Sequence, residues 1–262
     1  MRLFPVPFFV ASAAFGESLT AYFHNDSVNG FQLSDAYETH NMGLRYEAED
    51  YYALIDLGIV SPDMYIYRNE YREANRSFGE LITLELGQPT GVSGLHSYYA
   101  RIKSVGEFGI DEMQDIAHRI LSLQPVNEVN DLVRMPDDTW VGIGLRYNYH
   151  TNLWFIRDTT LSYDAYIGTD AGSIQLDATK AVSGSYFDYS VSTGLNAVLY
   201  DEVVSAAPVL ASTRHLVPYA NVKVEFDAFG YDFYVSERIS LPTITTDDRL
   251  FAVLSAGVTF DF

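Results

Sequence analysis

Hydrophobic and polar residues alternate along most of the chain, with the period of two residues that is typical of β-strands. The clearest example runs from Phe187 to Leu199, where aromatic, branched or small residues hold the odd positions and mostly polar residues the even ones. In a second example, from Ala220 to Ala228, Val222, Val224 and Phe226 alternate with charged or amide side chains. Each pattern predicts a strand with one apolar face and one polar face.

The predicted strands are long enough to cross a membrane. They run to about ten residues or more, the length that spans a bilayer at a tilt, whereas a soluble β-sandwich would favour shorter strands. The pattern predicts twelve strands, at residues 17–26, 39–49, 51–60, 79–88, 96–107, 139–150, 152–169, 172–182, 185–200, 215–229, 231–241 and 250–262. An even number is typical of single-chain bacterial barrels. We therefore predict an all-β fold, a twelve-stranded antiparallel transmembrane β-barrel.

The last strand and the charges within the later strands both fit such a barrel. The alternating end of the chain, from Ala256 to Phe262, resembles the C-terminal signature of bacterial outer-membrane barrels. This strand must pair with the first one, because an open sheet edge cannot face lipid.

Charged side chains inside the later strands predict a polar lumen: Lys223, Glu225, Asp227 and Arg238. Both a plugged and a water-filled lumen fit this pattern.

The lengths of the connections predict the orientation of the barrel. If both chain ends are periplasmic, connections after odd-numbered strands face outward, and the long ones fall there, at 27–38, 61–78, 108–138, 201–214 and 242–249. Connections after even-numbered strands are mostly tight, as at Glu49-Asp50, Ser183-Gly184 and Gly230. Long outer loops and short periplasmic turns are typical of these barrels.

One segment departs from the two-residue period. Apolar residues between Ile110 and Leu121 recur at helical spacing. Asp111 and Glu112 lie near the start of this segment and Arg119 near its end, an arrangement that complements the helix dipole. Because this connection follows an odd-numbered strand, the fifth, we expect one amphipathic helix at the extracellular rim, level with the lipid head groups.

Composition narrows the function classes. The net charge of −19 disfavours a nucleic-acid partner, because phosphate binding needs a basic surface, and an anionic ligand would need a bridging cation. The 262 residues contain no apolar run of the roughly 18 residues that a membrane helix needs. Cysteine is absent, which excludes disulfides, thiolate metal sites and cysteine nucleophiles and suits an oxidising cell envelope.

Residues 1–16 are typical of a short export signal, and the barrel domain follows at 17–262. Arg2 gives a basic start, an apolar stretch follows, and Ala11-Ser12-Ala13 or Ala14-Phe15-Gly16 offers a cleavage site with small residues. We therefore expect a signal peptide. An apolar lead-in to the first strand is the alternative interpretation.

Residues that suit ester hydrolysis gather at the predicted outer ends of the strands. His24-Asn25-Asp26 ends the first strand, Thr39-His40-Asn41 begins the second, and His118 lies on the predicted helix. A histidine beside such groups can act as a general base that activates water, while an acidic side chain orients it or binds a cation. Each motif also has a structural interpretation, as a surface histidine or an Asn-Asp turn. Three basic residues lie in the loop before the fourth strand: Arg68, Arg72 and Arg76.

Several of these motifs resemble the lipid A 3′-O-deacylase family of outer-membrane barrels. The segments from Ser18 to Asp26 and from Asp35 to Leu44 are similar to the family's Asn-Asp pair ending strand one and its Asp-Xaa-Tyr-Xaa-Thr-like stretch before Gly-Leu. Asn75 to Gly79 resembles its Asp-Arg-aromatic-Ala-Gly motif. Glu112 to Ile120 resembles its Glu-Xaa-Gln-Xaa-Xaa-Xaa-His-Arg helix, the most specific match. The motifs cover the N-terminal half, and the rest matches only by its barrel pattern.

The resemblance implies a calcium-dependent esterase that removes the 3′-acyloxyacyl group of lipid A in the outer leaflet. His118 is then the general base, and Asn25, Asp26 and Thr39 are the other catalytic residues. Calcium would act as a Lewis acid for the oxyanion. The residues implied as its ligands are Asp26, Thr39 and Gln124.

The sequence departs from the family pattern at three points. The family has an acidic calcium ligand where this chain has Gln124, a neutral oxygen donor, and Glu128 follows four residues later. Two extra residues after Thr39 make Asn41 its competitor. The family's activating lysine has no plain match, so Arg68 or Arg72 would replace it. The residues implied to bind the substrate are Arg68, Arg72 and Arg76.

These observations favour a lipid A deacylase of the bacterial outer membrane. Its partners would be lipopolysaccharide and membrane lipids, with no nucleic acid, and we expect a monomer. No Gly-Xaa-Ser-Xaa-Gly elbow, zinc-binding His-Glu-Xaa-Xaa-His, P-loop or dinucleotide motif is present. Two alternatives stay open: a phospholipase-type acyl hydrolase of the outer membrane, and a non-catalytic barrel, either a small channel or a degenerate family member.

Overall fold

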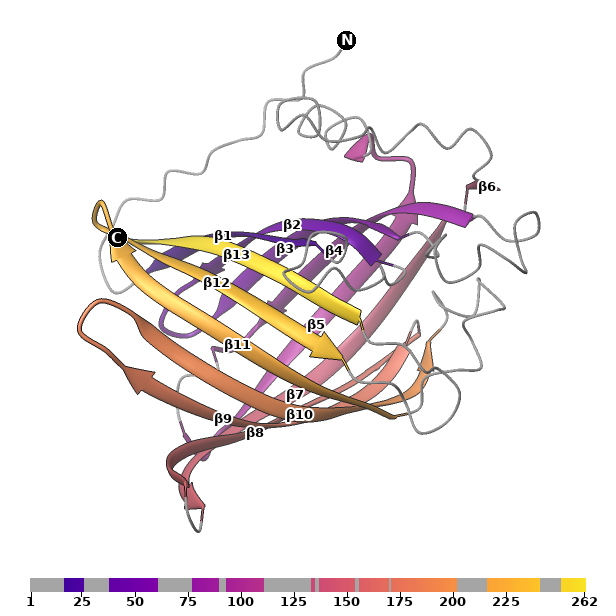
Figure 1. The fold of residues 1–262 in the computed structure, drawn as a ribbon. Helices are drawn as coiled ribbons and strands as arrows, with labels where there is room; N and C mark the ends of the chain where they lie inside the picture. Colours follow the sequence, from indigo (N-terminus) through magenta and orange to yellow (C-terminus); the bar gives the residue numbers. More distant parts are fainter. Residues whose placement is uncertain are drawn as a thin grey trace.

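The fold is a closed antiparallel β-barrel, as predicted (Figure 1). The computed structural model describes residues 17–25, 38–60, 77–89, 93–110, 133–134, 137–153, 156–169, 171–201, 216–240 and 251–262. Within these residues twelve long strands pair side by side around the barrel, each with its neighbours in the chain, and the first strand closes on the last.

The strands in chain order are β1 (Ser18–Asn25), β2 (Glu38–Glu47), β3 (Tyr52–Val60), β4 (Ser77–Gly87), β5 (His96–Gly106), β6 (Val133–Arg134), β7 (Asp138–Leu153), β8 (Ile156–Gly168), β9 (Ala171–Ser183), β10 (Asp188–Asp201), β11 (Leu216–Ala228), β12 (Tyr231–Ser240) and β13 (Phe251–Asp261). The short β6 was not predicted. It pairs in parallel with the start of β4 and is not one of the twelve barrel strands.

The twelve predicted strands are all present in the described part of the chain, and most of their bounds shift by only a few residues. The seventh strand was predicted to begin at residue 152, but β7 continues to Leu153, which pairs with Ile156 at the start of β8. The side chain of Asn152 accepts a hydrogen bond from the N–H of Asp158 at 3.0 Å. This contact joins the two strands beyond residue 150, where the sixth predicted strand ends.

The seam between β1 and β13 closes the sheet. Each residue of β1 pairs with β13, from Ser18 opposite Asp261 to Asn25 opposite Leu254. Just beyond the strands, the N–H of Phe262 donates to the carbonyl of Glu17 at 2.9 Å. The alternating end of the chain therefore does pair with the first strand, as its pattern predicted.

Side chains alternate between the lumen and the outer surface of the barrel. On β5, Tyr99 is buried whereas its neighbour Tyr98 is exposed. On β11, Lys223 and Glu225 line a cavity in the lumen, while Val222 lies exposed on the outer surface. The predicted polar lumen and apolar outer face are thus confirmed, and the apolar face suits contact with lipid.

Tyrosine rings in the lumen pack over glycines of the adjacent strands. The two residues of each pair stand opposite each other in the register: Tyr22 and Gly43, Tyr99 and Gly144, Tyr219 and Gly194, Tyr234 and Gly257. A Cβ atom at Gly144 would lie only 1.9 Å from the Tyr99 ring, so that only glycine leaves room for the ring. These pairs favour one register between strands, because a slip would move each ring off its glycine.

The connections leave the two ends of the barrel unequally. By the strand bounds, long connections run over residues 26–37, 61–76, 107–137, 202–215 and 241–250, all at one end. Short ones lie at the other end, such as 48–51, 184–187 and 229–230, near the C-terminus in Figure 1. This arrangement agrees with the predicted orientation, and we call the end with the long connections the outer rim. The chain is a barrel of the bacterial outer membrane.

Two predicted elements lie outside the described residues. Of the helix predicted at 110–121, only Ile110 is described, and nothing of the signal peptide predicted at 1–16 is described. Both elements stay predictions. Among the residues that the structure describes, no helix has the length and apolar character needed to span a membrane.

Candidate functional site

The predicted site residues on the first two strands are backbone neighbours at the outer rim. β1 ends at Asn25, which pairs with His40 near the start of β2. Thr39 lies beside His40 at a bulge in the pairing of β2 with β3, and its competitor Asn41 pairs with His24. The side chains of residues 25 and 38–41 are outside the described part of the structure.

The other predicted site residues lie outside the described residues altogether: Asp26, Arg68, Arg72, Arg76, His118 and Gln124. Their predicted roles stay predictions. The backbone nonetheless shows where their segments begin, because the chain leaves β1 at Asn25, enters β4 at Ser77 and passes beyond β5 to Ile110. The strands β1 to β5 are consecutive neighbours in the barrel. The motif-bearing segments therefore start from one arc of the outer rim.

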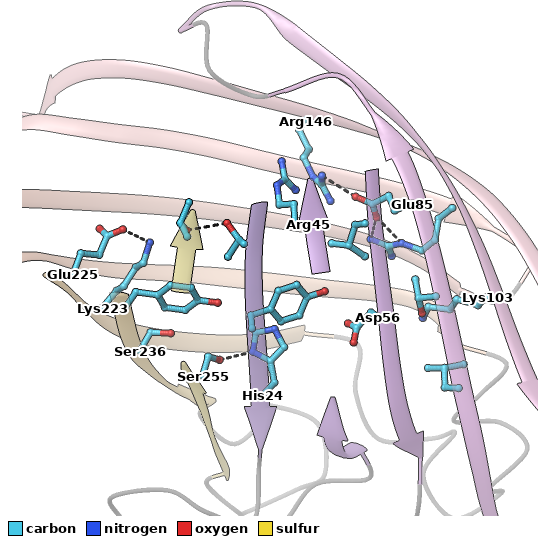
Figure 2. Close-up of a pocket in the computed structure, with 18 residues that line it drawn as sticks. His24, Arg45, Asp56, Glu85, Lys103, Arg146, Lys223, Glu225, Ser236 and Ser255 are labelled. Atoms are coloured by element: carbon cyan, nitrogen blue, oxygen red, sulfur yellow. Dashed lines mark hydrogen bonds and ion pairs between the residues drawn. The ribbon is translucent and has the colours of Figure 1, made fainter. Parts of the chain in front are cut away.

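A polar cavity of about 690 Å³ lies in the lumen (Figure 2). The charged and polar residues that line it come from strands on both sides of the seam. Those labelled in the figure are His24, Arg45, Asp56, Glu85, Lys103, Arg146, Lys223, Glu225, Ser236 and Ser255. Acidic and basic side chains are intermixed, and pairs such as Lys223 with Glu225 satisfy each other's charge within the lumen.

His24, one of the histidines at the predicted outer strand ends, takes part in a polar ladder along the seam. Its Nδ1 lies 2.6 Å from Oγ of Ser255, the residue opposite it on β13 (Figure 2). Further along the same face, the hydroxyls of Thr20 and Thr259 are 2.9 Å apart and also stand opposite each other. Cross-strand pairs of this kind stabilise a sheet, so the geometry favours a structural role for His24.

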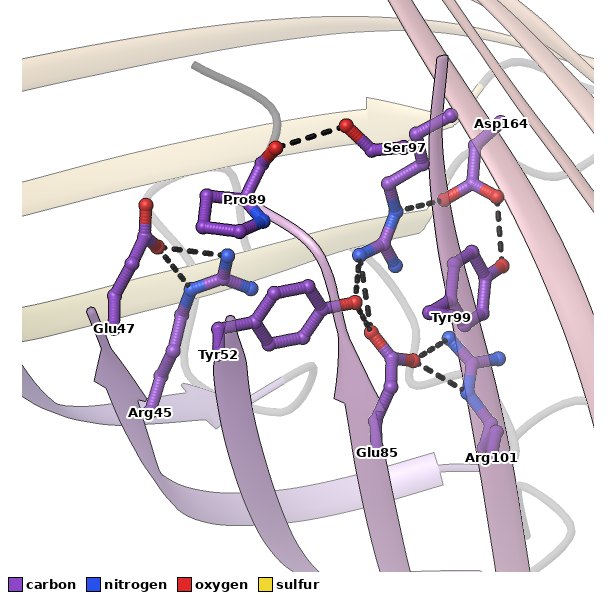
Figure 3. Close-up of polar contacts among 10 residues, drawn as sticks. Arg45, Glu47, Tyr52, Glu85, Pro89, Ser97, Tyr99, Arg101 and Asp164 are labelled. Atoms are coloured by element: carbon purple, nitrogen blue, oxygen red, sulfur yellow. Dashed lines mark hydrogen bonds and ion pairs between the residues drawn. The ribbon is translucent and has the colours of Figure 1, made fainter. Parts of the chain in front are cut away.

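Glu85 is the centre of an ion cluster in the lumen, close to the end of β4 that leads into a short connection (Figure 3). Arg101 donates from Nε and Nη2 to its Oε2, at 2.8 and 2.6 Å. The Tyr52 hydroxyl donates to Oε1 at 2.5 Å, and Nη1 of Arg146 lies 3.0 Å from the same oxygen. The Glu85 side chain is only 3% exposed. A carboxylate this deeply buried depends on such partners, because its desolvation would otherwise cost several kcal/mol.

The cluster continues around half of the barrel wall. Nε of Arg146 donates to Asp164 at 2.7 Å, and the Tyr99 hydroxyl donates to the same carboxylate at 2.7 Å. On the other side, the guanidinium of Arg45 lies over the ring of Tyr52, 3.9 Å from its centroid. These contacts join β2, β3, β4, β5, β7 and β8. Sequence reasoning predicted the polar lumen but missed these members, although inward positions occupied by Glu and Arg were a usable signal.

The predicted calcium site cannot be built from the described residues. Among them, no group of three or more His, Cys, Asp or Glu side chains is arranged to hold a metal ion. Asp26, Gln124 and the Thr39 side chain lie outside the described part. Their oxygen donors belong to the class that calcium prefers, so calcium stays a prediction from the sequence.

Similarity to a solved structure, rather than to known sequences, supports the architecture. No protein-family model matches the chain, and no curated protein sequence matches it. Among solved structures, the chain is similar to LpxR from Salmonella typhimurium, with a TM-score of 0.66 and 15% identity over 94% of this chain and all of that one. Weaker similarity extends to the COG4313 outer membrane channel from Pseudomonas putida F1, with a TM-score of 0.46 and 11% identity over all of both chains. At such low identity, the likeness to LpxR establishes the fold alone.

Proposed function

We propose that the chain is an outer-membrane esterase that removes the 3′-acyloxyacyl group from lipid A in the outer leaflet. The observation that carries the proposal is the position of the motif-bearing strand ends on one arc of the outer rim. Asn25 and Thr39 lie on adjacent strands there, and the segment with His118 starts from the same arc. The similar fold of LpxR, a lipid A deacylase, supports this assignment.

The proposed reaction is the hydrolysis of a carboxylic ester. His118 accepts a proton from water, and the water oxygen attacks the acyl carbonyl carbon. The bond between that carbon and the sugar oxygen then breaks, and the sugar oxygen takes the proton back from His118. Asn25 and Asp26 orient the reacting groups, and the loop arginines, Arg68, Arg72 and Arg76, bind the phosphorylated sugar. Calcium bound by Asp26, Thr39 and Gln124 would supply Lewis-acid stabilisation of the oxyanion.

Mass spectrometry of lipid A tests the function directly. Cells that produce the chain should contain lipid A that lacks the mass of the 3′-acyloxyacyl group, and cells without it should keep this group. Intact lipid A in both, with a correctly folded barrel in the outer membrane, would refute the proposal. Fatty acid released from glycerophospholipids instead would assign the chain to the phospholipase-type alternative.

The polar lumen favours a second candidate function, a small channel. Conduction needs a continuous water path, however, and the paired side chains of the Glu85 cluster extend into the lumen from six of the twelve barrel strands. We therefore expect no single-channel currents from the purified protein in planar lipid bilayers. Regular conductance steps from the unaltered chain would support the channel and oppose the plugged lumen.

A further inference from the structure

Glu80 is a carboxylate on a strand face that otherwise carries apolar side chains. On β4, Thr83 and Glu85 point into the lumen cavity, while Leu84 and Leu86 lie exposed on the outer face. Alternation along the strand places Glu80 on the outer face with the leucines. Glu80 is nevertheless 0% exposed. A carboxylate is stable in such a position only where hydrogen-bond donors replace water.

Two backbone donors come from the segment that follows β5. The N–H of Phe108 donates to Oε2 of Glu80 at 2.5 Å, and the N–H of Ile110 donates to the same oxygen at 3.1 Å. Gly109, between the donors, has a φ of 75°, a left-handed conformation that turns the chain so that both donors meet one acceptor. Ile110 is itself buried. The chain beyond β5 is therefore held against β4.

A glycine beside Glu80 leaves space for the segment after β5 to lie against β4. Gly106 is opposite Glu80 in the register of β4 and β5. A Cβ atom at Gly106 would lie 3.1 Å from the ring of Phe108, so the ring occupies the space above the glycine. Backbone hydrogen bonds and the packing of this ring thus fix the same three residues, 108–110, on the outer side of the wall.

We propose that Glu80 is a positioning residue that anchors the segment carrying His118 to the barrel wall. The role in catalysis rests on the proposed function, in which His118 is the base. Ile110 begins the segment predicted to be helical, and the first N–H groups of a helix have no partner within it. The Glu80 carboxylate accepts the N–H of Ile110, the first of these donors, and would complement the positive end of the predicted helix's dipole. In the predicted helix, His118 would lie about two turns beyond Ile110, so an anchor at Ile110 would set the distance of His118 from the ends of β1 and β2.

Kinetics of Glu80 variants test the positioning role. Glu80→Ala should lower kcat about ten- to a hundred-fold with little change in KM, because a misplaced base slows the chemical step more than binding. The dependence of kcat on pH should keep its midpoint, since the base is unchanged. Glu80→Gln keeps a carbonyl acceptor for both N–H groups and should restore most of the rate. Glu237→Ala, which removes an outward glutamate of β12, is the matched control and should act like the unaltered chain. A shifted pH midpoint or an unchanged kcat would overturn the proposal.

A distance measurement tests the anchor without any activity. The chain has no cysteine, so two spin labels can be attached at introduced cysteines, Met113→Cys and Val222→Cys, the second on β11, across the barrel from β4 and β5. The distance distribution should be narrow in the parent, broad in Glu80→Ala and narrow again in Glu80→Gln. The same width in all three would overturn the anchor. If the distribution broadens in Glu80→Ala while the parent leaves lipid A intact, the proposed function fails and the anchor stands.

Discussion

Arg101 donates to one Glu85 oxygen from two of its nitrogen atoms, at 2.8 and 2.6 Å, across the β4–β5 pair. The two residues stand directly opposite each other in the register. Arg146 reaches the second oxygen of the same carboxylate from β7, at 3.0 Å. One buried carboxylate therefore binds two guanidinium groups that come from different strands, and its loss would leave both guanidinium groups with the single carboxylate of Asp164, which pairs with Arg146.

Glu85→Gln should consequently lower the free energy of unfolding of the barrel by about 3 kcal/mol, the cost of removing one partner from a buried ion pair. Urea unfolding in detergent, followed by heat-modifiable migration, measures the change. Glu47→Gln is the control, because Glu47 pairs with Arg45 at 2.8 Å but its side chain is 38% exposed. The control should lose less than about 1 kcal/mol, as exposed pairs do. Equal losses in the two variants would contradict the importance of the cluster.

Gly144→Ala should also destabilise the barrel, by about 1–3 kcal/mol, because the added methyl group meets the ring of Tyr99. The test is a double-mutant cycle in the same unfolding assay. In a Tyr99→Leu background the alanine has more room and should cost clearly less. Additive effects of the two substitutions would mean that the ring and the glycine do not pack against each other.

The strands were predictable because a membrane barrel has one simple requirement. Lipid outside and polar groups inside impose the two-residue alternation on each strand, as Val222 and Lys223 illustrate on β11. Cross-strand partners were not predictable in the same way. The pairing of Tyr99 with Gly144, or of Glu85 with Arg101, depends on the register, which follows from the turns and from packing rather than from either strand's own pattern.

The candidate site was predictable only as a set of residues near the outer rim. The described backbone confirms that Asn25 and Thr39 lie on adjacent strands, and their roles stay predictions together with that of His118. Glu80 was missed, although its charge interrupts the outer face that Leu84 and Leu86 share. Alternation alone assigned that face to lipid. The partners of Glu80 follow β5 in the chain, and a strand pattern does not reveal which segment folds back over it.

Removal of calcium should abolish deacylation if Asp26, Thr39 and Gln124 hold the ion, since its loss withdraws the stabilisation of the oxyanion. The experiment strips metal from the folded protein, measures release of the acyl group in excess chelator, and then restores calcium. Recovery on addition of calcium, and no recovery in Asp26→Asn, is the expected result. Full activity in excess chelator would instead favour an oxyanion site formed by the loop arginines.

His118→Ala should abolish release of the 3′ acyl group while leaving the barrel folded. Removing a general base typically slows a reaction about a hundred- to ten-thousand-fold, and histidine is the side chain whose ordinary pKa lies nearest to neutral pH. A histidine with a purely packing role would instead show its loss as misfolding. The predicted helix already has an apolar face that includes Ile110 and Met113, so packing does not require the imidazole.

Single substitutions of the rival histidines make this prediction specific to His118. His24→Ala removes a hydrogen bond to Ser255 at the seam and should lower stability with little effect on the rate of the folded fraction. His40→Ala tests the residue that pairs with Asn25 in the backbone. Each variant is assayed for acyl release and for heat-modifiable migration in the same membranes. Near-normal release by folded His118→Ala would refute the assignment of His118 as the general base. Loss of release in folded His24→Ala alone would move the base to β1, because a seam hydrogen bond by itself cannot account for a loss of rate in a folded barrel.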